Sequence, residues 1–123
     1  MGLKHLHLHT RDRTTAEAFY THWLGLTVDR RGECLTFLTD GQGFDLALMD
    51  DKDPAPMPAW FHFGTKLADA EQVQCTYERM AEAGLKIRKA LYRDDSLATF
   101  RVEDPDGYAI ELYWERPGAP LDG

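Results

Sequence analysis

The sequence predicts an α+β protein made of two tandem βαβββ modules whose sheets form a cup. The order strand, helix and three strands occurs twice, over about residues 3–50 and again over about 58–115. The helix-to-strand junction Leu24–Val28 resembles Ala83–Ile87, so a weak internal duplication is the simplest explanation. At 123 residues, the chain is expected to form a single domain, 1–123.

The first module opens with a strand of alternating polar and apolar residues, Lys4-His5-Leu6-His7-Leu8-His9. We expect its leucines to pack inward and its three histidines to project together from the opposite face. A helix follows, with Asp12 as the predicted N-cap, Gly25 at its end and an apolar stripe between them. Three short β-prone runs separated by turn residues then predict a meander: 26–30, 34–38 and 44–49.

The second module follows an exposed linker, 50–58, which contains three prolines and cannot sustain a helix. A strand is expected around 60–67, and then a helix that opens at Asp69, with Gln72 as its capping-box partner, and closes at Gly84. Its predicted stripe is Val73, Tyr77, Met80 and Ala81. The remaining strands are predicted at 85–89, 97–102 and 108–114.

Composition argues against two classes of partner. The net charge of −7 repels phosphate backbones and anionic lipids, and no apolar run approaches the roughly 18 residues of a membrane span. We therefore expect neither nucleic acid nor a membrane as partner. The N-terminus lacks the apolar stretch of a secretory signal, and the two cysteines, Cys34 and Cys75, are expected to be buried small hydrophobic residues. A reducing, cytoplasmic location is the expectation.

Polar residues that alternate with the packed positions of the strands mark the expected lining of the cup. If each helix packs on the apolar face of its sheet, the opposite faces curve toward each other and carry these residues. The lining then comprises His5, His7, His9, Asp45, His62, Lys66, Glu111 and Tyr113. Two imidazoles and one carboxylate, from His5, His62 and Glu111, would bind a divalent ion and leave coordination positions open.

Four segments of the chain resemble the vicinal oxygen chelate superfamily, which includes glyoxalase I, bleomycin-resistance proteins and extradiol dioxygenases. They are Gly2-Leu3-Lys4-His5-Leu6, then Ala18-Phe19-Tyr20 with Leu24-Gly25-Leu26, then Phe61-His62-Phe63-Gly64, and finally Asp104-Pro105-Asp106-Gly107-Tyr108 with Ile110-Glu111-Leu112. The resemblance covers nearly the whole chain. It implies that His5, His62 and Glu111 are the ligands of one divalent ion, which can be Zn, Ni, Mn, Co or Fe.

The resemblance also implies an activity: chelation of an oxygen of a small-molecule substrate, in a lyase, isomerase or dioxygenase reaction, by a homodimer. His7, His9 or Asp45 would then move protons, since histidine is an effective acid or base near neutral pH. The alternative for His7 and His9 is that they are ordinary polar residues of the strand without a role in the chemistry. Asp45 is alternatively a fourth metal ligand, a pocket-lining acid or a surface charge. Candidate substrate contacts, each of which has a structural alternative, are Trp60, Lys66, Arg101 and Tyr113.

The chain departs from glyoxalase I at two positions that serve glutathione there. His9 stands in place of an arginine for the glutathione carboxylate, and Met49 in place of an asparagine. These departures disfavour glutathione as a substrate. A non-catalytic protein that binds an antibiotic or another small molecule is the alternative to an enzyme, and it would not need three metal ligands.

Overall fold

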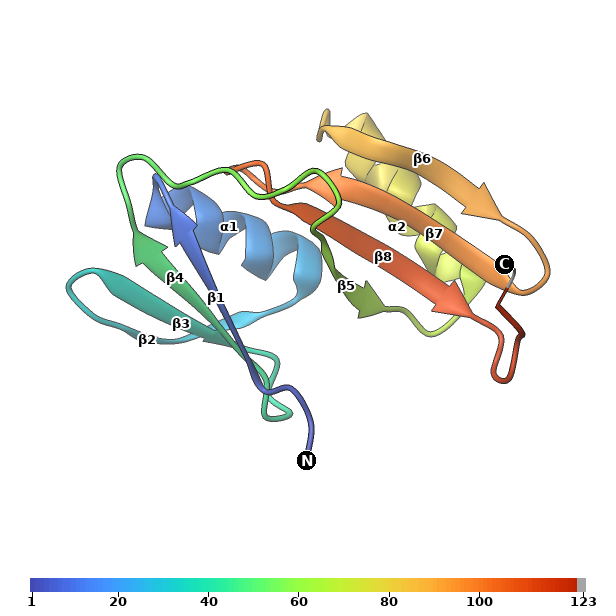
Figure 1. Cartoon of the computed structure of the whole chain (residues 1–123), viewed down its shortest axis with the longest axis horizontal. Helices are drawn as coiled ribbons and strands as arrows, with labels where there is room; N and C mark the ends of the chain where they lie inside the picture. Colours follow the sequence, from blue (N-terminus) through green and yellow to red (C-terminus); the bar gives the residue numbers. More distant parts are fainter. Residues whose placement is uncertain (122–123) are drawn as a thin grey trace. The chain divides into compact units, whose positions relative to one another are not determined.

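The structure, a computed structural model, describes residues 1–121. The chain divides into two compact units, unit 1 (Met1–Pro56) and unit 2 (Met57–Gly123). Each unit contains one helix and one four-stranded mixed sheet (Figure 1), so the predicted α+β class with two tandem βαβββ modules is confirmed.

Unit 1 is a four-stranded sheet with one helix across one face (Figure 1). Its sheet order is β1-β4-β3-β2, and β1 runs parallel to β4 while the other neighbours are antiparallel. Apolar side chains between helix and sheet, among them Phe19, Leu8 and Leu46, are buried and form the core. The elements are β1 (His5–Thr10), α1 (Arg13–Leu24), β2 (Thr27–Arg31), β3 (Leu35–Thr39) and β4 (Asp45–Asp50).

Helix α1 begins and ends at the residues that the sequence predicts. The Asp12 carboxylate accepts a hydrogen bond from the Thr15 backbone N–H at 3.3 Å, which satisfies one of the free donors of the first turn. Gly25 ends the helix in the left-handed region with φ 69°, a conformation that glycine adopts without the steric cost that a Cβ brings.

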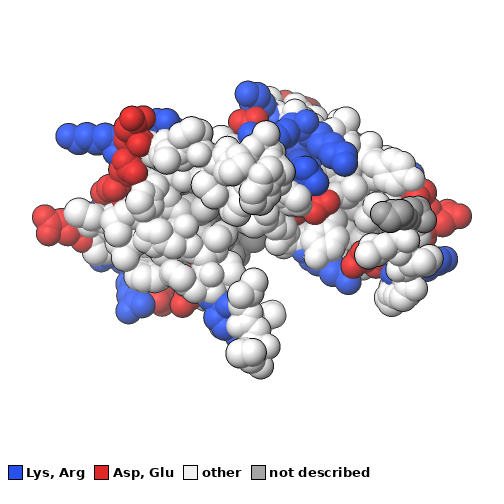
Figure 2. Space-filling model, viewed as in Figure 1, with Lys and Arg blue, Asp and Glu red and all other residues white. Residues whose placement is uncertain are grey.

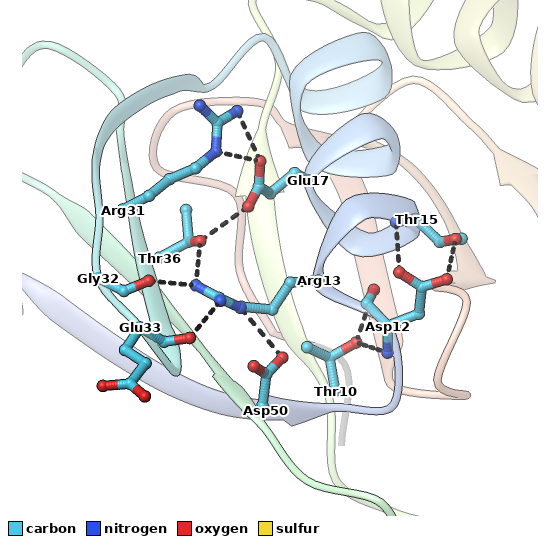
Figure 3. A network of polar contacts seen from close by, with 10 residues as sticks. All are labelled: Thr10, Asp12, Arg13, Thr15, Glu17, Arg31, Gly32, Glu33, Thr36 and Asp50. Carbon is cyan, nitrogen blue, oxygen red and sulfur yellow. Dashed lines mark hydrogen bonds and ion pairs between the residues drawn. The ribbon is translucent and has the colours of Figure 1, made fainter.

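A buried carboxylate connects α1 to the β2–β3 hairpin (Figure 3). Glu17 accepts hydrogen bonds from the Arg31 guanidinium at 2.8 and 3.0 Å and from the Thr36 hydroxyl at 2.7 Å. Arg13 donates to the same hydroxyl at 3.1 Å and to the carbonyl of Gly32 at 3.1 Å. Burial opposes ionisation of Glu17, but the hydrogen bonds from Arg31 and Thr36 outweigh it and hold the pKa of Glu17 below its ordinary value.

Unit 2 repeats the architecture of unit 1, with sheet order β5-β8-β7-β6 and a parallel β5–β8 pair. Helix α2 lies behind β6 and β7 in the view of Figure 1. The predicted stripe is confirmed at Val73 and Met80, which are buried, and at Tyr77, whose ring centroid lies 5.1 Å from that of Phe100, whereas Ala81 is exposed and does not belong to it. The elements are β5 (Phe63–Lys66), α2 (Ala70–Glu82), β6 (Ile87–Arg93), β7 (Leu97–Glu103) and β8 (Ala109–Glu115).

Three other expectations were wrong in detail. Strand β5 begins at Phe63 rather than near residue 60, and β6 extends to Arg93. Both cysteines are exposed rather than buried. Cys34 lies in the turn that precedes β3, and Cys75 follows the buried Val73 by two residues, about 200° around the helix, so it points away from the sheet. Among residues 1–121, neither helix is long and apolar enough to cross a membrane.

Candidate metal centre

Strand β8 of unit 2 presents Glu111 on the face of the sheet opposite to α2. Its neighbours Ile110 and Leu112 are almost fully buried, at 0% and 1% exposure, whereas Glu111 and Tyr113 are half-buried. Because side chains alternate along a strand, Glu111 and Tyr113 share the open face and the two apolar residues pack toward the helix. The predicted placement of Glu111 and Tyr113 on the face of the sheet opposite to the helix is therefore confirmed.

His62 and Glu111 form a pair on this open face. The distance from His62 Nε2 to Glu111 Oε1 is 3.5 Å, and about a quarter to a third of each side chain is exposed. Two ligands about 2.1 Å from an ion in tetrahedral geometry lie about 3.4 Å from each other. The pair therefore has the separation that two ligands of one divalent ion require.

The backbone sets the orientation of the His62 ring. Its Nδ1 lies 3.1 Å from the carbonyl oxygen of Trp60, which accepts hydrogen bonds only, so Nδ1 carries a proton. In the neutral ring, the lone pair of Nε2 then faces the Glu111 carboxylate. Two lone pairs oppose each other unless a proton or a cation lies between them. A backbone carbonyl on the second nitrogen is also the usual partner of a metal-binding histidine.

Thr99 and Gly64 position the Glu111 carboxylate from the neighbouring strands. The Thr99 hydroxyl donates to Glu111 Oε2 at 2.6 Å, which leaves Oε1 directed at His62. On the other side, Gly64 lies in register with Glu111, and a Cβ at this glycine would come within 3.0 Å of the Glu111 carbonyl oxygen. The absence of a side chain at position 64 therefore permits the close approach of β5 to β8 beside the site.

In unit 1, the three histidines of β1 project from one face, as predicted. The ring centroids of His5 and His7 are 6.3 Å apart, and those of His7 and His9 are 5.1 Å apart. Asp45 lies beside His5 in the parallel β1–β4 register. His9 Nδ1 donates to Asp51 Oδ2 at 2.8 Å, and this hydrogen bond holds the pKa of Asp51 below its ordinary value.

The four predicted substrate contacts all belong to unit 2. Lys66 and Tyr113 are register partners on the open face, and Arg101 is the register partner of Glu111. Trp60 is 75% exposed and precedes β5, where its carbonyl oxygen orients His62. The structure therefore places Lys66, Arg101 and Tyr113 on the sheet face that carries Glu111.

Two of the three predicted metal ligands, His62 and Glu111, lie together in unit 2, and His5 belongs to unit 1. Within residues 1–121, no group of three or more His, Cys, Asp or Glu side chains is arranged to hold one ion. The three-ligand set therefore stays a prediction.

Sequence reasoning did not identify the partners of these residues. Thr99, Gly64 and Asp51 contribute to the described contacts through strand register or from a loop far along the chain. Strand alternation places Thr99 and Arg101 on one face, but only the β7–β8 register shows that this face is the one with Glu111.

Comparisons with known proteins agree with this architecture. The family model of the Glyoxalase/Bleomycin resistance protein/Dioxygenase superfamily matches residues 2–112. A structure of a possible glyoxalase from Bacillus cereus is 34% identical, with a TM-score of 0.78, over 91% of this chain and 97% of that chain. A search of curated proteins found no match.

Two more distant structures share the fold. A glyoxalase/bleomycin resistance protein/dioxygenase from Nocardioides is 21% identical with a TM-score of 0.74, over 100% of this chain and 89% of that one. A lactoylglutathione lyase from Agrobacterium tumefaciens is 21% identical with a TM-score of 0.73, over 92% of each chain. The family match over most of the chain shows that this protein belongs to the Glyoxalase/Bleomycin resistance protein/Dioxygenase superfamily.

Proposed function

We propose that this chain is a divalent-metal-dependent enzyme that acts on a small oxygen-chelating substrate, in a lyase, isomerase or dioxygenase reaction. His62 and Glu111 are two of its ligands, and His5 supplies the third. The observation that carries the proposal is the His62–Glu111 pair at 3.5 Å, with the histidine oriented by a backbone carbonyl and the carboxylate by Thr99.

Two imidazoles and a carboxylate accept Zn, Ni, Mn, Co or Fe, so the donor set does not distinguish among these ions. When bound, the ion supplies Lewis-acid stabilisation of negative charge on a substrate oxygen. His62 and Glu111 hold their donor atoms toward one point, and three protein ligands leave positions for substrate oxygens.

Proton transfer is proposed for the polar residues of the unit 1 sheet face. His9 is the strongest candidate because Asp51 accepts a hydrogen bond from its Nδ1 at 2.8 Å, which fixes the orientation and the tautomer of the ring. His7, the next histidine on the same face, and Asp45 are the other proposed acid–base residues. Trp60, Lys66, Arg101 and Tyr113 are the proposed substrate contacts.

Metal content separates this enzyme from a protein that only binds a small molecule. Untagged protein should contain, or take up on reconstitution, about one equivalent of Mn, Fe, Co, Ni or Zn. Less than about 0.2 equivalents with every one of these ions would rule out the metalloenzyme and favour the non-catalytic binding protein. Measured oxygen uptake or product formation with an α-hydroxy ketone or a catechol then assigns the class of reaction.

Glu111→Ala tests the ligand assignment directly. Loss of one ligand should weaken the affinity for Zn or Co by at least about a hundredfold, while the far-ultraviolet circular dichroism of the metal-free protein stays unchanged. The matched control is Glu115→Ala, on the same strand and face but exposed at its end. If Glu111→Ala keeps the stoichiometry and affinity of the wild type, Glu111 is not a ligand.

We also propose that the chain forms a homodimer and works in the cytoplasm. Family members often pair, and light scattering after gel filtration should give twice the chain mass of 14.0 kDa. The two free cysteines, Cys34 and Cys75, are exposed, which suits a reducing compartment.

A further inference from the structure

Arg101 carries the only buried side-chain nitrogen or oxygen without a hydrogen-bond partner among residues 1–121. The atom is Nε, on a half-buried side chain of β7. An unpaired donor removed from water costs free energy, so native proteins seldom retain one without a reason. A bound ligand would remove this cost if one of its atoms accepted a hydrogen bond from Arg101 Nε.

The surroundings of Arg101 indicate what kind of ligand this is. Lys89 on β6, Arg101 on β7 and Glu111 on β8 are register partners, so the three side chains lie in one row across the open face. Figure 2 shows Lys and Arg side chains grouped over unit 2, on the side of its sheet that faces away from α2. This row places Arg101 directly beside the proposed metal ligand Glu111, with Lys89 one strand further along the row.

The acidic residues nearest to this row are already engaged. Glu103 lies within 3.2 Å of Arg88 and 3.5 Å of Lys86, and Glu111 pairs with His62 and Thr99. Neither carboxylate accepts a hydrogen bond from Arg101 Nε. A bound divalent ion would add further positive charge beside Arg101, so the local field favours an anion.

We infer that Arg101 and Lys89 form an oxyanion-binding subsite next to the metal ligands, and that the substrate therefore carries a carboxylate, phosphonate or phosphate close to its chelating oxygen. The Nε–H and an Nη–H of arginine form a planar fork that matches two oxygens of such a group, and Lys89 adds a point charge. This inference rests on the proposed function, because it names the substrate class of the same site.

The first experiment needs no metal. Full-length, metal-free, ¹⁵N-labelled protein is titrated with inorganic phosphate and, separately, with succinate, while the Nε–Hε signal of Arg101 is followed. The Arg101 signal is assigned by its loss in Arg101→Lys, and it should shift when an anion binds. The anion that binds with the higher affinity shows which oxyanion the subsite prefers. A signal that moves with neither anion would overturn the subsite.

Variants show whether the fork itself matters. Arg101→Gln should weaken binding of the preferred anion at least about tenfold, and Arg101→Lys less, because a lysine keeps the charge without the fork. The control is Arg93→Gln, since Arg93 donates to Glu71 and Gln74 of α2 and should leave anion binding as in the wild type. Anion binding by Arg101→Gln at wild-type strength would contradict the inference.

A second experiment tests whether anion and metal sites serve one ligand. Co(II)-loaded protein is titrated with succinic monohydroxamate or with butyrohydroxamate. Both compounds chelate a metal through the hydroxamate, but only succinic monohydroxamate carries a carboxylate. The wild type should bind the carboxylate form at least about tenfold more tightly, and Arg101→Gln should lose this preference. An equal preference in both proteins would overturn a shared substrate site. Failure to load cobalt or any other ion would instead defeat the proposed function, while the metal-free titration still decides the anion subsite.

Discussion

At the scale of single residues, the candidate centre depends on which atom of each side chain is already in use. His62 donates from Nδ1 to a backbone carbonyl, and Glu111 accepts from Thr99 at Oε2, so the remaining atoms Nε2 and Oε1 face each other at 3.5 Å. Neither ligand needs to reorganise to share an ion. Preorganisation of this kind is what second-sphere partners contribute to metal sites.

Thr99→Val tests this contribution because valine keeps the shape of threonine and removes its hydroxyl. Without the 2.6 Å hydrogen bond, the Glu111 carboxylate can rotate, and we expect metal affinity to fall about 10- to 100-fold. Isothermal titration with Zn or Co measures the change. Thr99→Ser, which keeps the hydroxyl, should retain affinity within a few-fold. Unchanged affinity in Thr99→Val would show that Thr99 does not position the carboxylate.

At the scale of elements, one contact in each unit holds neighbouring elements in their arrangement. Glu17 ties α1 to the β2–β3 hairpin through Arg31 and Thr36 (Figure 3), and in unit 2 the bare backbone at Gly64 lets β5 approach β8. The first contact is electrostatic and depends on pH. The second is steric and does not.

Replacement of Glu17 by glutamine should destabilise the protein by about 1–2 kcal/mol at pH 7, because charge-assisted hydrogen bonds become neutral ones. Glu17 has a folded pKa below its ordinary 4.5, so its ionised form stabilises the fold above pH 4.5 and that contribution is lost as pH falls through the folded pKa. Urea unfolding should therefore show a difference between the two proteins that shrinks below pH 4.5. Glu33→Gln, with an exposed side chain in the same hairpin, is the control. A difference that persists at pH 2 would refute the electrostatic origin.

Gly64→Ala tests the steric contact. A Cβ placed 3.0 Å from the Glu111 carbonyl and 3.5 Å from its Cβ forces β5 and β8 apart by a few tenths of an ångström. We expect a loss of about 1 kcal/mol or more in stability, in the range of an overpacked contact, and weaker metal binding. Gly118→Ala adds a Cβ that meets no atom within 4 Å, although its positive φ of 74° brings a strain of its own. Metal affinity in that variant should match the wild type, and an equal loss in both would argue against the contact.

At the scale of the whole molecule, the two units repeat one architecture but carry different polar residues. Unit 2 holds the His62–Glu111 pair, and unit 1 holds the histidine row of β1 with the His9–Asp51 hydrogen bond. In the proposed ligand set, His5 belongs to unit 1, and His62 and Glu111 belong to unit 2. The increase in the free energy of unfolding that a bound metal causes tests in the intact protein whether His5 is a ligand.

Metal at a hundred times its dissociation constant should stabilise the wild type by about 2.7 kcal/mol. The same metal concentration should stabilise His5→Ala far less, as little as Glu111→Ala, although the two residues belong to different units. His22→Ala, an exposed histidine of α1, should respond as the wild type does. Thermal unfolding with and without Zn measures each response. A full response in His5→Ala would remove His5 from the ligand set.

Local pattern determined the two βαβββ modules, the caps of α1 and the sheet faces that carry the histidines and Glu111. Alternation and helical periodicity act over a few residues, so one sequence suffices to read them. The same reasoning failed for Cys34 and Cys75, because exposure depends on which side of an element the neighbours cover.

Only the tertiary structure decided which partners the site residues have. Thr99 and Gly64 meet Glu111 through the registers of β7 and β5 with β8, and Asp51 reaches His9 from 42 residues along the chain. Glu17 is buried on α1, and the hydrogen bonds that it accepts from Arg31 and Thr36, 14 and 19 residues further along the chain, explain its burial. These contacts join distant segments, and strand register, which no local preference encodes, sets them.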